Sequence, residues 1–347
     1  MAKSSKSAKP AGKKFDAAAK AAWLANKASK ASKIDAAKEM LEAGLGALQT
    51  SAEWKAMLTS IATNARRRLS VSRYSFRNQI LVAMQKPCAT SVAGFQAWKG
   101  VGRNVKKGEK GIAILSPRIF RKEHTLASGE VKEVGGIYFQ TVYVFDVSQT
   151  EGADLPEPPA LKLDIDDDAA FHAYQEKIAD VALAIEVQAG QATKPVSSMV
   201  FKTSAELRAE GAMSCPGALG WYSQSTRGIV IVADHNRTTQ FHTACHEVAH
   251  ALLHPVGNAH SSPEREVEAE SVAYIVCHAL GLDSGNMSFP YVATWAQRAS
   301  GGSSATKMVQ ESGARIVKAA HIILDALLGD ADADADVSDV EMQSAAE

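Results

Sequence analysis

The residues best suited to chemistry are two histidines four positions apart, His246 and His250, with Glu247 directly after the first. On a helix, positions four apart lie on one face, so both imidazoles can bind a single Zn²⁺ ion. Glu247 lies beside them and can take a proton from a water molecule that this metal activates. The sequence therefore predicts one zinc site, with His246 and His250 as ligands and Glu247 as the catalytic carboxylate of peptide hydrolysis.

A third protein ligand is required if the zinc ion is to keep one position open for water. Glu266 and Glu270, four apart on a second predicted helix, can divide this work: one binds the metal and the other hydrogen-bonds a ligand histidine. The spacing permits either assignment, whereas Glu268 points to another side of the helix. The competing interpretation is that the glutamates at alternate positions from 264 to 270 only form a solvated helix face.

A strongly basic stretch with interleaved aromatic residues covers residues 49–122, which carry fifteen Lys or Arg and only two acids. Cations that follow phosphates, together with aromatic planes on which bases stack, suit single-stranded nucleic acid. Tyr74 lies between two arginines and is the best stacking candidate, while Asn78 and Gln79 can hydrogen-bond sugar or phosphate. The competing interpretation is that the aromatic residues pack a core. The predicted DNA contacts are Arg66, Arg67, Arg68, Arg73, Tyr74, Arg77, Asn78, Gln79, Arg103, Lys106, Lys107 and Lys110.

The elements that position these residues follow from apolar spacing. Apolar side chains three and four apart predict helices, and alternating ones predict strands. In the first half, a Ser128–Gly129 turn predicts that two strands form a hairpin. The expected elements of this half are helices over 54–69, 76–84 and 92–98 and strands over 112–115 and 137–147.

The second half is predicted to place the HExxH motif on the first of two long helices. Its expected elements are a helix over 169–185, a hairpin of 219–223 with 229–232, and helices over 238–254, 263–280 and 314–328. The strand 229–232 either pairs with an extended peptide substrate or is an ordinary core strand. The sequence does not choose a residue to stabilise the oxyanion of the reaction. The equal candidates are Tyr222, Tyr274, His235, His242, His260, His278 and His321.

The fold class expected from these elements is α+β, with two domains joined by a linker. Few large apolar residues are available to anchor the Lys-rich N-terminus, and the C-terminus holds seven acids and no base, so both ends are expected to be disordered. The predicted organisation is a basic arm over 1–48, a DNA-binding domain over 49–150, a linker over 151–168, a metallopeptidase-like domain over 169–329 and an acidic tail over 330–347.

Cysteine usage and hydropathy indicate the compartment. The four cysteines form no CxxC pair, so they are expected to be reduced thiols rather than ligands of a zinc ribbon. No apolar run approaches the length of a membrane span, and no apolar segment follows the basic N-terminus. We therefore expect a cytoplasmic protein without a membrane partner.

Three segments of the first half carry a family resemblance: RYSFRNQIL at 73–81, GFQAW at 94–98 and GRNVKKGEKG at 102–111. They look like the N-terminal, single-stranded-DNA-binding domain of ArdC-type antirestriction proteins. The HExxH and ExxxE helices resemble the ArdC metallopeptidase domain and, more loosely, ImmA/IrrE peptidases. The ExxxE spacing also resembles gluzincins, in which the first acid binds zinc, and this implies Glu266 as ligand and Glu270 as the hydrogen-bond partner of a histidine.

The resemblance covers residues 50–147 and 195–285 and implies a mobile-element or phage protein that protects incoming DNA from restriction. Three functions fit this sequence. The first is a single-stranded-DNA-binding antirestriction protein with a zinc metallopeptidase-like domain. The second is a DNA-activated zinc protease with a protein substrate, and the third is a DNA-binding protein in which zinc is only structural. The sequence leaves open whether proteolysis occurs.

Overall fold

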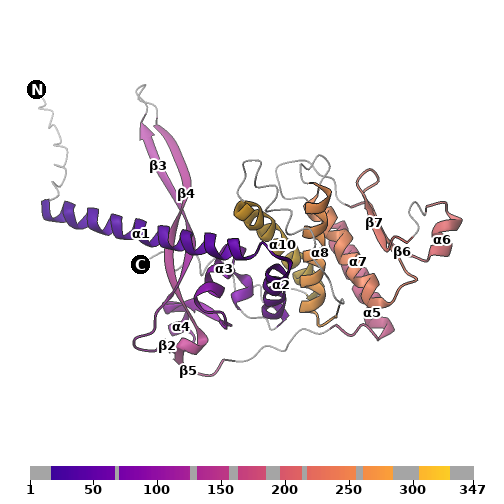
Figure 1. Ribbon diagram of the computed structural model, residues 1–347, viewed down its shortest axis with the longest axis horizontal. Helices are drawn as coiled ribbons and strands as arrows, with labels where there is room; N and C mark the ends of the chain where they lie inside the picture. Colours follow the sequence, from indigo (N-terminus) through magenta and orange to yellow (C-terminus); the bar gives the residue numbers. More distant parts are fainter. Residues whose placement is uncertain are drawn as a thin grey trace, which may run out of the picture.

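The structure is a computed structural model, which describes residues 17–66, 70–125, 131–155, 163–184, 196–212, 217–254, 261–283 and 305–328. It is of the mixed helix-and-sheet class that the sequence predicts. Figure 1 shows a half with a long, protruding strand pair and a half built on packed helices, with helix α10 (Ala305–Leu328) between them. The predicted acidic tail, the Ser128–Gly129 turn and residues 1–16 of the predicted arm lie outside the described residues.

The first half contains the predicted helices α2 (Ser51–Arg66) and α3 (Phe76–Gln85), the second of which ends just before Pro87. The predicted hairpin is confirmed as β3 (Ile112–Thr125) paired antiparallel with β4 (Val131–Asp146). We call residues 113–125 and 131–143 of this pair the ribbon. The helix predicted over 92–98 is wrong at its start. Residues Val92–Gly94 form strand β1 instead, because Val92 is buried opposite Asp146 of β4, and the helix α4 begins at Phe95.

Helix α1 (Ala17–Ala47) occupies most of the predicted basic arm. The prediction of an unanchored segment is wrong for its C-terminal part, where Leu41 and Leu45 are buried in the main core. A Cβ atom at Gly44 would lie 2.5 Å from Cγ2 of Ile80, so the small residue lets α1 approach α3 closely. Apolar residues at 41, 45 and 48 recur at helical spacing and could have revealed this anchor.

The second half contains the predicted helices α5 (Asp168–Leu183), α7 (Arg237–Leu253) and α8 (Ser262–Ala279). Its sheet has the order β6-β8-β7, with β6 at Ser198–Lys202, β7 at Gly220–Ser223 and β8 at Gly228–Val232. Strand β8, expected as a possible substrate-pairing strand, has a neighbour on each side and is therefore a core strand. The short elements of the chain are η1 (Ser70–Arg73), α4 (Phe95–Gly100), β2 (Arg103–Val105), η2 (Val147–Gln149), β5 (Thr150–Gly152) and α6 (Ser204–Ala209).

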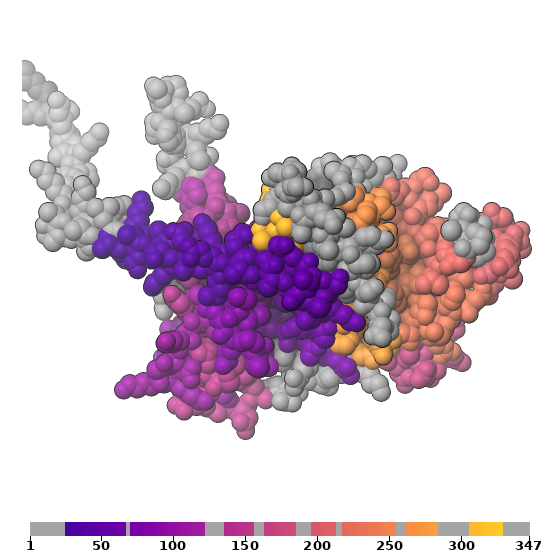
Figure 2. All heavy atoms as spheres, in the orientation of Figure 1, coloured from indigo at the N-terminus to yellow at the C-terminus, as the bar shows by residue number. Residues whose placement is uncertain are grey.

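One large core runs through both predicted domains and joins α1, α2 and α3 to α7, α8 and α10. The indole of Trp54 in α2 donates a buried hydrogen bond of 3.0 Å to the Ser271 hydroxyl in α8. A smaller core lies under the first sheet, around Val71, Ile114 and Val144. Figure 2 shows the two halves in direct contact, with α1 lying across the face turned to the viewer.

Both ends of the predicted linker are packed rather than free. Residues Thr150–Gly152 form strand β5 against β2, and Leu163 is buried, with its backbone N–H donating to the carbonyl of Leu280. None of the helices in the described part of the chain is both long and apolar enough to cross a membrane.

Candidate functional site

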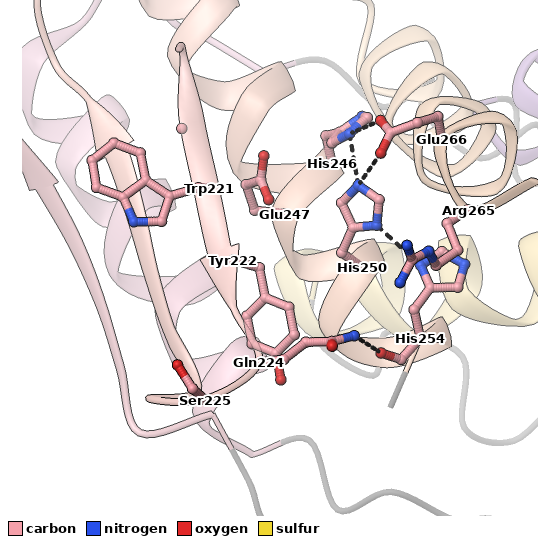
Figure 3. A pocket seen from close by; sticks show the side chains of 11 residues that line it. Trp221, Tyr222, Gln224, Ser225, His246, Glu247, His250, His254, Arg265 and Glu266 are labelled. Atoms are coloured by element: carbon pink, nitrogen blue, oxygen red, sulfur yellow. Dashed lines mark hydrogen bonds and ion pairs between the residues drawn. The ribbon is translucent and has the colours of Figure 1, made fainter. Parts of the chain in front are cut away.

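Helix α7 presents the HExxH motif toward an open cleft. The side chain of Asn236 caps its first turn by accepting the backbone N–H of Thr239 at 2.9 Å. Phe241, Ala244 and Val248 are buried against the rest of the second half, so the helix is fixed by its apolar face. The four-residue spacing then brings His246 and His250 together on the side that faces α8 (Figure 3).

The structure brings His246, His250 and Glu266 into one group that can hold a metal ion. The two Nε2 atoms are 3.0 Å apart, and the Glu266 carboxylate lies 3.4 Å from His246 Nε2 and 3.6 Å from His250 Nε2. Ligand atoms bound tetrahedrally at about 2.0–2.1 Å from Zn²⁺ lie roughly 3.3 Å apart, so the spacing fits a divalent metal ion. Two imidazoles and one carboxylate are also the ligand types that such an ion takes in a catalytic site.

Glu270 has a different place, behind the histidines. One of its oxygens lies 3.1 Å from His246 Nδ1 and the other lies 3.5 Å from His242 Nε2. Because His246 Nε2 faces the metal group, Nδ1 is the atom left to donate, and Glu270 is placed to orient this ring. The geometry thus separates the two assignments that the spacing left open, with Glu266 at the metal position and Glu270 behind His246.

The four glutamates at alternate positions of α8, from 264 to 270, each contact a specific partner. The competing interpretation, that they only form a solvated helix face, is therefore excluded. Glu264 accepts the backbone N–H and hydroxyl of Ser261 in a capping box at the start of α8. Glu268 is fully buried and lies 3.0 Å from His254 Nε2. It points away from the metal group, as its place on the helix predicts, but its role was not apparent from the sequence.

Electrostatics in this group favour a cation. Burial alone would lower the pKa of His246, but hydrogen bonds to Glu266 and Glu270 raise it to about 10. The same two histidines hold the pKa of Glu266 well below its ordinary value. Burial would raise the pKa of Glu270, but its hydrogen bonds to His242 and His246 lower it to about 2. The carboxylates therefore stay ionised and present negative charge where a divalent cation would sit.

Glu247 is almost fully buried at the wall of the cleft, and this burial raises its pKa, although the neighbouring His246 and His250 oppose the shift. A raised pKa suits a carboxylate that must gain and lose a proton. In Figure 3, Glu247 lies between strand β7 and the two histidines.

The cleft has a volume of about 700 Å³ and is lined by β7, α7 and the start of α8. Strand β7 is at the edge of the three-stranded sheet and contributes Trp221 and Tyr222 to the cleft. Tyr274, another predicted oxyanion candidate, is buried elsewhere, with its hydroxyl 2.8 Å from that of Thr59 in α2. Of these two tyrosines, Tyr222 lines the cleft and Tyr274 does not.

Two family models match separate parts of this chain. Residues 33–145 match the N-terminal domain of anti-restriction factor ArdC, and residues 206–278 match an IrrE N-terminal-like domain. The chain is of the ArdC type. The resemblance seen in the sequence is thus confirmed for both halves, and the second match contains the whole metal group.

Individual relatives of this ArdC-type chain are distant. An uncharacterized protein of Bacillus anthracis is 28% identical over 249 residues, which are 65% of this chain, and the chain spans 41% of that protein's length. Two crystal structures of antirestriction protein ArdC from the R388 plasmid were also found. The metal-free one is 20% identical, with a TM-score of 0.45, and covers 73% of this chain and 85% of its own. The Mn(II)-bound one is 18% identical, with a TM-score of 0.42, and covers 74% and 86%.

Three of the predicted DNA contacts are buried in this structure, so these predictions are wrong. Tyr74 is 2% exposed and donates its hydroxyl to the carbonyl of Val92. Asn78 bonds both backbone groups of Leu115, and Gln79 donates to the carbonyls of Ser72 and Tyr74. Polar side chains that satisfy buried backbone groups cannot be distinguished from ligand-binding ones by residue type alone.

Apart from Arg77, which lies over the ring of Phe139, the predicted basic contacts fall into three groups. Arg67 and Arg68 lie outside the described residues. Three arginines have partners within the protein. Arg66 lies beside Gly281, Arg73 lies 3.2 Å from the Asp325 carboxylate, and Arg103 donates to the Thr150 hydroxyl at 2.8 Å. Lys106, Lys107 and Lys110 are exposed around the turn after β2. The lysines are thus the predicted contacts most accessible to a strand of nucleic acid.

Exposed aromatic side chains lie instead on the ribbon, where sequence reasoning placed none of the contacts. Phe120, Tyr138, Phe139 and Tyr143 are each more than a third exposed. Arg77 lies 5.9 Å from the ring centre of Phe139, and Lys33 of α1 lies 5.6 Å from that of Tyr143. The alternation of apolar and polar residues over 137–143 could have shown that some of these rings face solvent.

Proposed function

We propose that this protein is an antirestriction protein that binds single-stranded DNA and carries a catalytic zinc site of the metallopeptidase kind. The observation that supports it most directly is the group of His246, His250 and Glu266 beside the buried Glu247, in a cleft of an ArdC-type chain. The residues offer two neutral imidazole nitrogens and one carboxylate oxygen, a set that suits Zn²⁺ and leaves one position open.

A zinc ion held there would polarise a substrate carbonyl and lower the pKa of water. The residues of this chain would bind the substrate, transfer the proton and stabilise the oxyanion. An extended peptide can pair with the outer edge of β7, which brings its carbonyl to the histidines. Glu247 would accept a proton from the attacking water and return it to the leaving amine. The hydroxyl of Tyr222, at the cleft wall, is the candidate donor to the developing oxyanion.

The nucleic-acid surface that we propose combines the aromatic residues of the ribbon with nearby cations. Tyr138 and Phe120 lie 6.2 Å apart between ring centres, and Arg118 stands opposite Tyr138 in the register of the two strands. Rings that face solvent beside cations are suited to stack unpaired bases while the cations contact phosphates. A duplex hides the faces of its bases, so this surface favours single strands.

Two assays on one preparation test the proposal. Metal content should approach one zinc ion per chain, and affinity for single-stranded DNA should exceed affinity for duplex of equal length and fall steeply with salt. Equal binding to both forms of DNA would refute the single-strand assignment, and a chain that binds no divalent metal would refute the zinc site.

A second candidate function is a zinc protease that is activated by single-stranded DNA. The burial of Glu247 and its raised pKa favour it, since a purely structural site has no use for a general base. Candidate DNA-associated proteins can be incubated with the zinc-loaded chain, with and without single-stranded DNA. Cleavage that requires both DNA and Glu247 supports this function, and cleavage that persists in Glu247→Gln rules it out.

A further inference from the structure

Behind the metal group lies a buried chain of polar side chains that the proposed reaction does not use. It begins at His250 and passes through His254 and Glu268 to Arg315 of α10, so it joins three helices. His254 and Glu268 are 1% and 0% exposed. Burying a carboxylate is costly unless it is paired and hydrogen-bonded, and Glu268 has partners on both of its oxygens.

The distances along this chain are those of hydrogen bonds. His250 Nδ1 lies 3.0 Å from His254 Nδ1, and His254 Nε2 lies 3.0 Å from Glu268 Oε2. The other oxygen of Glu268 accepts from the Ser312 hydroxyl at 2.7 Å and from the Arg315 guanidinium. The backbone of His254 is fixed as well, since its N–H donates to the carbonyl of His250 and its carbonyl accepts from Gln224.

Only one arrangement of protons lets His250 serve as a metal ligand and satisfies every one of these bonds. His250 Nε2 faces the metal group and must keep its lone pair, so the proton of the neutral ring is on Nδ1. His254 Nδ1 then accepts, and its own proton is on Nε2, where it is donated to Glu268. Glu268 remains ionised, with Ser312 and Arg315 as its remaining donors.

The two ligand histidines therefore have different support. His246 Nδ1 is held directly by the Glu270 carboxylate, whereas, among the described residues, His250 Nδ1 contacts the imidazole of His254 and reaches the Glu268 carboxylate through it. We propose that His254 is a positioning residue for the metal site, which transmits the hydrogen bond and charge of Glu268 to His250 and so fixes the tautomer and orientation of that ligand. This inference deepens the proposed function and rests on it.

The affinity of the full chain for Zn²⁺, measured by competition with a chelator, tests the inference. His254→Phe keeps the buried ring but removes both nitrogens, and the affinity should fall about 10–100-fold, as for other groups that support metal ligands. Glu268→Gln should lower it in the same range, and the double variant should lose less than the product of the two single losses. Lys318→Met, on the exposed side of the same α10 helix, is the matched control and should bind Zn²⁺ as the unaltered chain does.

A variant that fails to fold is recognised by its circular dichroism. In that case the ¹⁵N signals of the histidines in the unaltered, zinc-loaded chain decide. The neutral Nε2–H form of His254 supports the inference, and a proton on its Nδ1 overturns it. Zinc affinity within twofold of the unaltered chain in folded His254→Phe also overturns it. If the unaltered chain binds no zinc, the proposed function fails first, so the two failures are distinguishable.

Discussion

His246 and Glu247 show how neighbouring residues acquire opposite tasks from their surroundings. His246 contacts two carboxylates, Glu266 and Glu270. Their negative charge favours a cation beside this ring. Glu247 points to the other side, into the wall of the cleft, where burial favours its neutral form. In the proposed site, two residues that are adjacent in the chain would thus supply a metal ligand and a proton acceptor.

Substitution of the two cleft carboxylates should separate metal binding from catalysis. Glu266→Gln removes a charged ligand, so zinc affinity should fall by more than about 100-fold, since even residues behind the ligands contribute about 10–100-fold. Glu247→Gln should bind zinc normally and lose any hydrolytic activity. Metal content after dialysis and cleavage of a verified substrate give the two readouts.

The opposite pattern would contradict these assignments. If Glu266→Gln kept its zinc while Glu270→Gln lost it completely, Glu270 would be the ligand and the order along α8 would be reversed.

For single residues, the sequence predicted contacts set by spacing within one helix and missed contacts between helices that are distant in the chain. The His246–His250 pair and the Glu266–Glu270 pair are each set by one helical repeat, so their spacing was sufficient. His254 and Arg315 depend on how α7, α8 and α10 pack, and Arg315 is 47 residues from Glu268 along the chain. Tyr74, Asn78 and Gln79 were assigned to DNA because residue type does not reveal burial.

Among the elements, the ribbon differs most from what sequence patterns predicted. Its strands continue well past Leu115, where the first predicted strand ended, and the extension carries apolar residues on both faces. Ile119 and Ile137, paired across the strands, are 68% and 65% exposed. A two-stranded element with so little burial is not stabilised by its own core, and its exposed rings are available to a ligand.

Removal of a ribbon ring should weaken binding to single-stranded DNA. Tyr138→Ala should cost about 1–3 kcal/mol of binding free energy, the usual contribution of one stacked base. Tyr74→Phe is the control, because the ring of Tyr74 is buried and its hydroxyl donates to the backbone carbonyl of Val92. Fluorescence anisotropy with a labelled oligonucleotide measures both variants, and equal loss in the two would argue against the ribbon.

Helix α10 should make stability depend on pH through His321. Burial lowers the pKa of this imidazole below its ordinary 6.5, against the opposing effect of Asp325, and its Nε2 has no hydrogen-bond partner within the described part of the chain. The unfolded chain therefore binds more protons, and the free energy of unfolding should decrease as the pH falls through about 6.5.

Urea midpoints at pH 7.5 and 5.5 measure this dependence. His321→Gln should lose less stability between the two pH values than the unaltered chain does. His172→Gln, on the exposed side of α5, should behave like the unaltered chain. Other titrating groups contribute equally to all three proteins, so an unchanged difference in His321→Gln would contradict the assignment.

In the whole molecule, the two halves are joined by packing, and Gly313 of α10 lies at the junction. A Cβ atom at this position would overlap the ring of Phe76 in α3. Alanine is normally the better helix former by about 0.5–1 kcal/mol, but overpacking typically costs about 1–3 kcal/mol. Gly313→Ala should therefore destabilise the chain.

The matched control for this prediction is Gly46→Ala, where the added Cβ would meet no atom within 4 Å. This variant should be neutral or slightly stabilising in the same urea titration. If Gly313→Ala were stabilising as well, the two halves would not be packed as closely at this point as the structure describes.

Arg315 lies two positions after that glycine, on the helix that completes the support of His250. The part of the chain recognised as an IrrE-like domain ends at residue 278, far short of this arginine. A fragment cut to those limits would keep His246, His250 and Glu266 and yet lose Ser312 and Arg315, the α10 donors to the Glu268 carboxylate. We therefore expect a stably folded fragment of this half to require α10, because this helix supplies the counter-charge of a carboxylate that is buried in the complete chain.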